Sequence, residues 1–182
     1  AINSSGNPEE SISLFDRALS EAREAGLENL AVDAAHMLGI VTRGEDALAW
    51  NLKAMEMAAV ATDPKARRWR GSLSNNLGWT YFDLKQYDEA LLMFEKHLKI
   101  RTEQVDSVQV SFARWSIAKT YRCMGRTKEA LAIQQELLEA RELPGAELEG
   151  YVYEEMGECL LQFKREEEAR PHFARAWELL HT

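Results

Sequence analysis

Histidine and cysteine have the widest chemical repertoire in this sequence, because they can act as acids, bases, nucleophiles or metal ligands. The histidines are His36, His97, His172 and His181. They form neither an H-x3-H pair nor a ligand set with cysteine, so a metal site has little support. The motifs G-x4-G-K-[ST], G-x-S-x-G and H-E-x2-H do not occur. We therefore expect no catalytic residue, no metal and no cofactor, and the chain is predicted not to be an enzyme.

The two cysteines, Cys123 and Cys159, are too few and too far apart in sequence for a disulfide framework. A free cysteine often serves simply as a small core residue, and free thiols persist in a reducing compartment. We therefore expect a cytoplasmic protein.

Charge and hydropathy argue against two classes of partner. The net charge is −8 at pH 7, whereas binding to nucleic acid or to an anionic membrane surface requires a basic surface. No apolar run approaches the roughly 20 residues needed to span a bilayer. The most apolar stretch, residues 30–41, is interrupted by Asp33 and His36. We expect neither nucleic acid nor membrane as a partner.

Carboxylates recur at one position in every repeat described below, immediately before a small residue. They are Glu9, Glu10, Glu45, Asp46, Asp88, Glu89, Glu129, Glu167 and Glu168. Each set stands at the predicted start of a helix, where the helix dipole favours negative charge. A structural role explains why every repeat carries these carboxylates. A catalytic role for one carboxylate would not explain the presence of the others.

The stretch from Ser74 to Arg101 holds an ordered set of small and large residues that recurs along the chain. A small residue, Gly78, is followed by Tyr81, Ala90 and Phe94. The positions equivalent to Gly78 are Ala35, Ala118 and Gly157, separated by 43, 40 and 39 residues. The positions equivalent to Ala90 are Ala47, Ala130 and Ala169. Small residues allow close approach of helices, and the large ones fill the space around the contact.

This pattern, L-G-x2-Y followed by A-x3-F, resembles the tetratricopeptide repeat family, and the long repeats are similar to those of kinesin light chains. The resemblance implies an all-α fold, a right-handed α–α superhelix of about nine antiparallel helices. It also implies a non-catalytic module that binds a peptide or protein segment in a concave groove.

We expect a single repeat domain over residues 1–182. Residues 1–7 are predicted to be a disordered start, and residues 8–25 a second helix without its first helix. The complete repeats, each a pair of helices, are predicted at about 28–62, 65–104, 107–141 and 145–180. The unpaired first element and the absence of an initiator methionine suggest a segment of a longer protein.

The resemblance places the first helix of each unit along the groove. Carried over position by position, it gives the predicted binding residues Asn75, Trp79, Phe82, Phe112, Trp115, Lys119 and Arg122. Trp79 and Trp115 would anchor an apolar group, Asn75 would hold backbone, and Lys119 with Arg122 would bind an acidic group. Glu154 and Glu158 in the last repeat would repel a second carboxylate of the ligand and so set the direction in which the ligand binds. The predicted partner is a peptide or protein segment with apolar and acidic groups.

Three alternatives remain at this point. The extra aromatic residues could pack between helices and take no part in binding. The chain could be a sensor or regulatory segment whose output domain lies elsewhere, or an all-α enzyme with an unrecognised site. The end helices carry Phe15 at one end and Trp177 at the other, so we also expect end-face self-association, for example as a homodimer.

Overall fold

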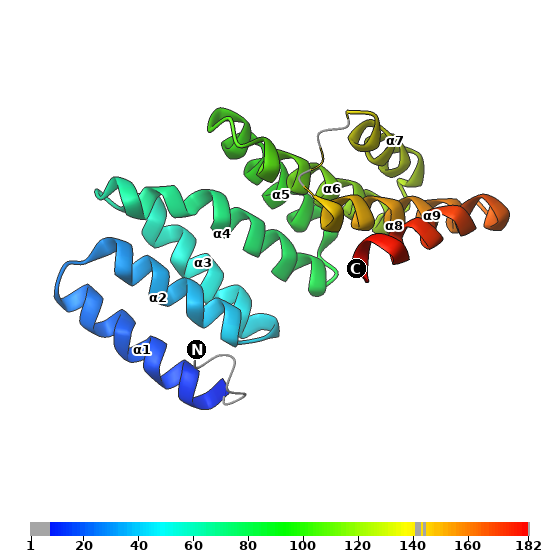
Figure 1. The fold of residues 1–182 in the computed structure, drawn as a ribbon. Helices are drawn as coiled ribbons and strands as arrows, with labels where there is room; N and C mark the ends of the chain where they lie inside the picture. Colours follow the sequence, from blue (N-terminus) through cyan, green and yellow to red (C-terminus); the bar gives the residue numbers. More distant parts are fainter. Residues whose placement is uncertain (1–7, 141–142, 144, 182) are drawn as a thin grey trace. The chain divides into compact units, whose positions relative to one another are not determined.

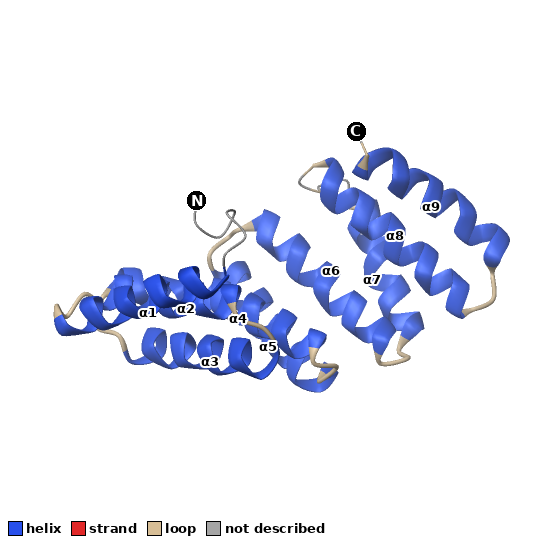
Figure 2. Ribbon diagram, turned by 90° about the horizontal axis from the view of Figure 1, so that it is seen from below, coloured by secondary structure: helices blue, strands red, loops and turns tan. Residues whose placement is uncertain are grey.

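The computed structural model describes residues 8–140, 143 and 145–181, and within them the chain forms nine α-helices and no strand (Figures 1 and 2). The helices are α1 (Pro8–Glu24), α2 (Glu28–Val41), α3 (Gly44–Val60), α4 (Pro64–Asp83), α5 (Tyr87–Glu103), α6 (Ser107–Cys123), α7 (Thr127–Glu139), α8 (Ala146–Gln162) and α9 (Glu166–Leu180). The predicted all-α class is confirmed. The predicted start at residues 1–7 lies outside the described residues. None of the described helices combines the length and the apolar character that a bilayer crossing requires.

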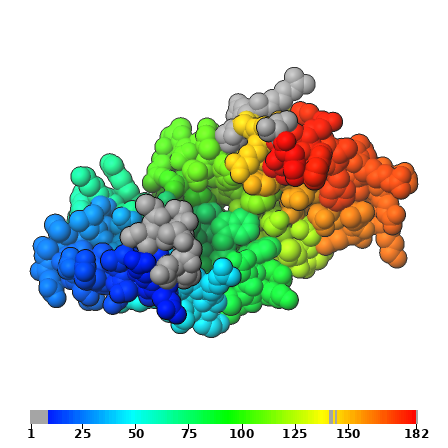
Figure 3. Space-filling view, turned by 60° about the horizontal axis from the view of Figure 1, so that its bottom comes forward, coloured from blue at the N-terminus to red at the C-terminus, as the bar shows by residue number. Residues whose placement is uncertain are grey.

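The chain divides into two compact units, Ala1–Met93 and Phe94–Thr182, and the division falls within α5. In the first unit, α2 packs against α1, α3 and α4. The space-filling view shows α1 and its neighbours, in shades of blue, as one packed surface (Figure 3). In the second unit, α6 and α8 both pack against α7, and α9 covers α8. Each unit therefore builds its own core from neighbouring helix pairs.

Helices pack closely at the positions where the sequence repeats a small residue. Ala90 and Ala118 have no exposed surface. At Gly157, an added Cβ would lie 2.7 Å from the ring of Phe173. Phe173 therefore occupies the space that a side chain at residue 157 would need. This contact confirms the predicted pairing of a small residue on a first helix with a large residue on the second.

Helices α1, α4, α5, α6 and α8 end in backbone hydrogen bonds around one residue in the left-handed conformation. Gly125 fills this place after α6 with a φ of 79°, but Lys85, Val105 and Lys164 have φ near 60° without being glycine. After α5, the Asp106 amide donates to the Arg101 carbonyl at 3.0 Å and so completes the turn. The left-handed conformation brings Cβ close to the following carbonyl oxygen, which strains a β-branched residue such as valine most.

Replacing Val105 with glycine should therefore stabilise the second unit by about 1 kcal/mol, the left-handed strain less the greater entropy of glycine in the unfolded chain. Val105 is 89% exposed, so the change removes little packing. The opposite change, Gly125→Val, should lower stability, because an added Cβ there meets no atom within 4 Å and only backbone strain remains. Urea unfolding of the two variants tests this, and a stability loss in Val105→Gly would contradict it.

Candidate functional site

The predicted binding residues of the first unit lie together on α4. The Trp79 and Phe82 rings meet edge to face with centroids 5.4 Å apart, and Phe82 makes a second such contact with Tyr87 at 5.3 Å. Both Trp79 and Phe82 are partly exposed. The Asn75 side chain, one turn before Trp79, has no hydrogen-bonding partner among the described residues. The three side chains form a partly exposed apolar surface with an amide at one end.

The predicted aromatic residues of the second unit contact the core. Phe112 and Trp115 of α6 pack against the buried cluster that contains Leu137 and Val152. The Trp115 ring also stacks on Tyr151 of α8 with centroids 5.3 Å apart, and its Nε1 donates to the Tyr151 carbonyl at 3.3 Å. In this unit the structure therefore gives the aromatic residues a packing role between helices, which was the first alternative left open by the sequence.

Lys119 and Arg122 of α6 share one carboxylate, that of Glu155 on α8. Lys119 Nζ donates to Glu155 Oε1 at 2.6 Å, and Arg122 donates to Oε2 from Nε at 2.7 Å and to Oε1 from Nη2 at 3.1 Å. The Glu155 side chain is only 2% exposed, while the two cations are partly exposed. The cations predicted to bind a partner's acidic group thus already hold an acidic group of the chain itself.

Sequence reasoning missed Glu155, although a regular spacing points to it. Trp115 contacts Tyr151 and Lys119 contacts Glu155, both 36 residues apart, three fewer than the 39-residue repeat of this unit. Contacts between consecutive first helices therefore connect positions about one helical turn out of register. An opposite charge placed 36 residues after Lys119 was the signal available in the sequence.

In the first unit, contacts between consecutive first helices have the same three-residue offset but join neutral groups. His36 of α2 and Asn76 of α4 are 40 residues apart, three fewer than the 43-residue repeat, and their side-chain nitrogens lie 3.0 Å from each other. Trp69 Nε1 donates to Asn29 Oδ1 at 3.0 Å, and the Trp69 ring lies 5.1 Å from that of His36. Burial lowers the pKa of His36 below its ordinary value of 6.5, while the charge of Asp33 opposes this shift.

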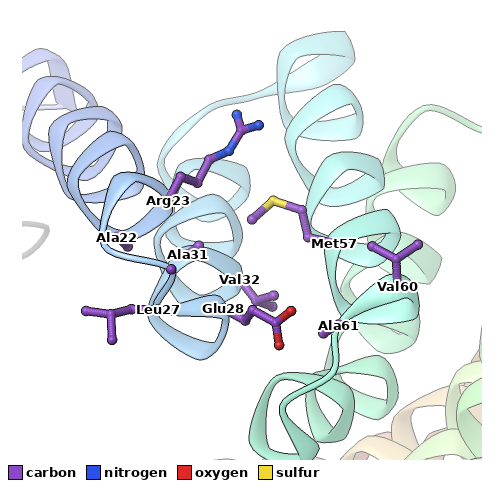
Figure 4. Close-up of a pocket in the computed structure, with 10 residues that line it drawn as sticks. Ala22, Arg23, Leu27, Glu28, Ala31, Val32, Met57, Val60 and Ala61 are labelled. Carbon is purple, nitrogen blue, oxygen red and sulfur yellow. The ribbon is translucent and has the colours of Figure 1, made fainter.

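A small pocket of about 210 Å³ lies where α1, α2 and α3 come together (Figure 4). Its walls are mainly apolar, and Met57 and Val60 approach it from α3.

The carboxylate of Glu28 accepts hydrogen bonds from the backbone amides of Asp63, at 2.6 Å, and of Thr62. These backbone hydrogen bonds lower the pKa of Glu28. Glu28 therefore holds the turn between α3 and α4.

Within the part of the chain that is described, no cluster of three or more His, Cys, Asp or Glu side chains could hold a metal ion. Cys159 is a buried free thiol. Burial raises the pKa of Cys159 to about 12, which keeps this thiol protonated at neutral pH.

Comparison with protein families decides the classification. The sequence profile of the tetratricopeptide repeat matches residues 27–103 and 109–180. The chain belongs to the tetratricopeptide repeat family. Repeats of this family are generally non-catalytic scaffolds for protein–protein interaction. No curated protein sequence matches the chain.

Solved structures share the fold at low sequence identity. A variant of a Podosopora anserina protein, described as a kinesin light chain with nearly identical TPR-like repeats, has a TM-score of 0.78 at 14% identity, covering 97% of this chain and 88% of that one. BtubC (BKLC) from P. vanneervenii gives 0.74 at 20% identity, covering 94% and 73%. MamA from AMB-1 gives 0.53 at 22% identity, covering 95% and 93%. These likenesses confirm the predicted tetratricopeptide fold and its similarity to kinesin light chain repeats.

Neutralising Glu155 should destabilise the second unit, because Lys119 and Arg122 would lose the buried carboxylate that they share. Breaking a buried ion pair by removing one partner costs about 3 kcal/mol or more. We expect Glu155→Gln to lower the urea midpoint accordingly. The matched change Glu129→Gln removes an exposed pair with Arg126 and a charge at the start of α7, so it should lower the midpoint much less. Equal effects of the two changes would contradict the assignment.

Acid should destabilise the first unit through His36. A histidine whose pKa is lowered by folding binds protons more readily when unfolded, so its contribution is present above pH 6.5 and lost as the pH falls below that value. The stability difference between pH 7.5 and pH 5.5 should shrink in His36→Gln. His172 also has a lowered pKa through burial, so His172→Gln gives the control for the second unit. An unchanged pH dependence in His36→Gln would refute the prediction.

Proposed function

We propose that this chain is a non-catalytic interaction module that binds a peptide or protein segment along the exposed faces of its first helices. The observation that carries the proposal is the surface of Asn75, Trp79 and Phe82 on α4. Its two aromatic rings are held by edge-to-face contacts, so binding them costs little conformational entropy. Partly exposed Trp residues concentrate binding energy in interfaces.

The amide of Asn75 supports recognition of an extended backbone. It offers donors and an acceptor, and no described residue uses them. An apolar side chain of the partner would contact Trp79 and Phe82 while its backbone reaches Asn75. This gives the first unit both an anchor and an orienting group, as small recognition sites generally require.

In the second unit, the proposed contribution is a preference for acidic partners. Lys119 uses one of its three donors on Glu155 and remains partly exposed, and Arg122 also lies 3.8 Å from Glu158. Because Glu155 balances part of the positive charge, a partner carboxylate would be held by the remaining donors. The acidic preference should therefore be weaker than two unpaired cations would produce.

The test uses peptides selected from a random displayed library on the intact protein, with affinities measured by calorimetry. Trp79→Ala should weaken binding by about thirtyfold, which corresponds to about 2 kcal/mol. Asn75→Ala should weaken it less, because one hydrogen bond contributes about 1 kcal/mol. Circular dichroism checks that each variant keeps its helicity.

The matched control is Trp177→Ala, which removes a tryptophan that is 65% exposed on the second helix α9. It should leave the affinity unchanged. Selected peptides that lose affinity with Trp177→Ala and keep it with Trp79→Ala would move the binding surface to second helices and overturn the proposal. Amidation of a peptide's carboxylates tests the acidic preference separately.

A further inference from the structure

A polar pocket lies inside the first unit, where the turn between α2 and α3 meets the last turn of α4 (Figure 1). Its volume is about 460 Å³. Thr42 and Arg43 line it from the turn, and Thr80 and Asp83 line it from α4. The proposed peptide surface around Trp79 contributes no residue to this lining, so the two surfaces can be considered separately.

Arg43 and Asp83 bring opposite charges to this pocket. Both side chains are exposed, and neither has an ion-pair or hydrogen-bond partner among the described residues. The equivalents of Arg43 in the second unit, Arg126 and Arg165, each pair with a glutamate three residues later. Asp46 stands three residues after Arg43, and no ion pair joins them. The guanidinium of Arg43 is therefore available to a carboxylate from outside the chain.

The two threonine hydroxyls of the pocket present acceptors, because their hydrogens are already used. Thr42 Oγ1 donates to the Leu38 carbonyl at 2.6 Å, and Thr80 Oγ1 donates to the Asn76 carbonyl at 2.9 Å. A hydroxyl has one hydrogen and two lone pairs, so both oxygens can still accept. With the carboxylate of Asp83 they give one pocket three acceptors. A primary ammonium group carries the matching three N–H donors.

Asn51 lies behind these acceptors and is 2% exposed. Its Nδ2 donates to the Ala47 carbonyl at 3.0 Å and to the Thr80 hydroxyl at 3.2 Å, which leaves Thr80 one lone pair for a ligand. Its Oδ1 lies against Gly39, where an added Cβ would be 2.7 Å away, and has no hydrogen-bond partner among the described residues. Gly39 and Ala47 also line the pocket. The unpartnered oxygen therefore adds negative potential behind the wall, which favours a cationic group in front of it.

We propose that this pocket binds a free α-amino acid with an apolar side chain. The ammonium group of the ligand would donate to the three acceptors, and Arg43 would donate to its carboxylate. Ile40 and Leu84 are also part of the lining and would contact the apolar side chain. A ligand with only one of the two charges would leave one charged wall of the pocket without a partner, and a bare metal cation would be repelled by Arg43.

L-Leucine is the probe, and an NMR shift titration of the intact, isotope-labelled protein measures its affinity. We expect saturable one-site binding, with the largest shifts at the backbone amides of residues 39–44 and 80–84. L-Leucinamide lacks the carboxylate and N-acetyl-L-leucine lacks the ammonium group, so each should bind about tenfold more weakly or worse. γ-Aminobutyrate has both charges but no side chain, and it should also bind more weakly than leucine.

Substitutions assign each end of the ligand to its residue. Arg43→Gln should weaken leucine binding about tenfold and remove the advantage of leucine over leucinamide. Asp83→Asn should weaken it similarly and remove the advantage of leucine over N-acetyl-leucine. The matched control is Arg126→Gln, at the equivalent turn of the second unit, which should leave the affinity for leucine unchanged. Circular dichroism establishes that the variants keep their helicity.

Absence of saturable binding, or equal binding of leucine and its two derivatives, would overturn the proposal. Tighter binding of γ-aminobutyrate would overturn the assignment to α-amino acids. Leucine binding that persists in Trp79→Ala supports a separate pocket, whether or not that variant still binds peptides. Loss of leucine binding in Trp79→Ala would overturn the proposal, because the ligand would then lie on the peptide surface.

Discussion

Close approach between helices is the constraint on which the other contacts of this chain depend. At Gly157 the ring of Phe173 lies where a Cβ would be, and Ala90 and Ala118 are fully buried. Because the helices lie this near to one another, side chains on the flanking turns can reach the next repeat of the same unit. The contacts from His36 to Asn76 and from Lys119 to Glu155 follow from that proximity.

These contacts use side chains that were proposed to bind a partner. Trp115 already stacks on Tyr151, and the basic pair of the second unit is balanced by a buried carboxylate. Pairing within the chain leaves these cations fewer donors for a partner's carboxylate. In the proposed function, the partly exposed aromatic pair on α4 would therefore discriminate between partners more than the basic pair would.

The sequence was sufficient for the repeat, because small residues spaced near 40 positions report directly on helix packing. It was less informative at turns, since the end of α5 carries no glycine and uses Val105 in a left-handed conformation. The positions on the first helices could be read from the repeat, but the partner of Lys119 could not be read from it. That pairing depends on a stagger of three residues between neighbouring first helices, which a repeat alignment does not contain.

Within each unit, neighbouring first helices are joined by side-chain contacts, and the chemistry of these contacts differs between the units. Their stability should therefore change differently with temperature. In the first unit the connecting groups are neutral amides and aromatic rings, whereas in the second a carboxylate joins two cations. The cost of removing charged groups from water falls as temperature rises. Warming should therefore weaken the charged connection less than the neutral one, so we expect the contacts between first helices to loosen at a lower temperature in the first unit than in the second.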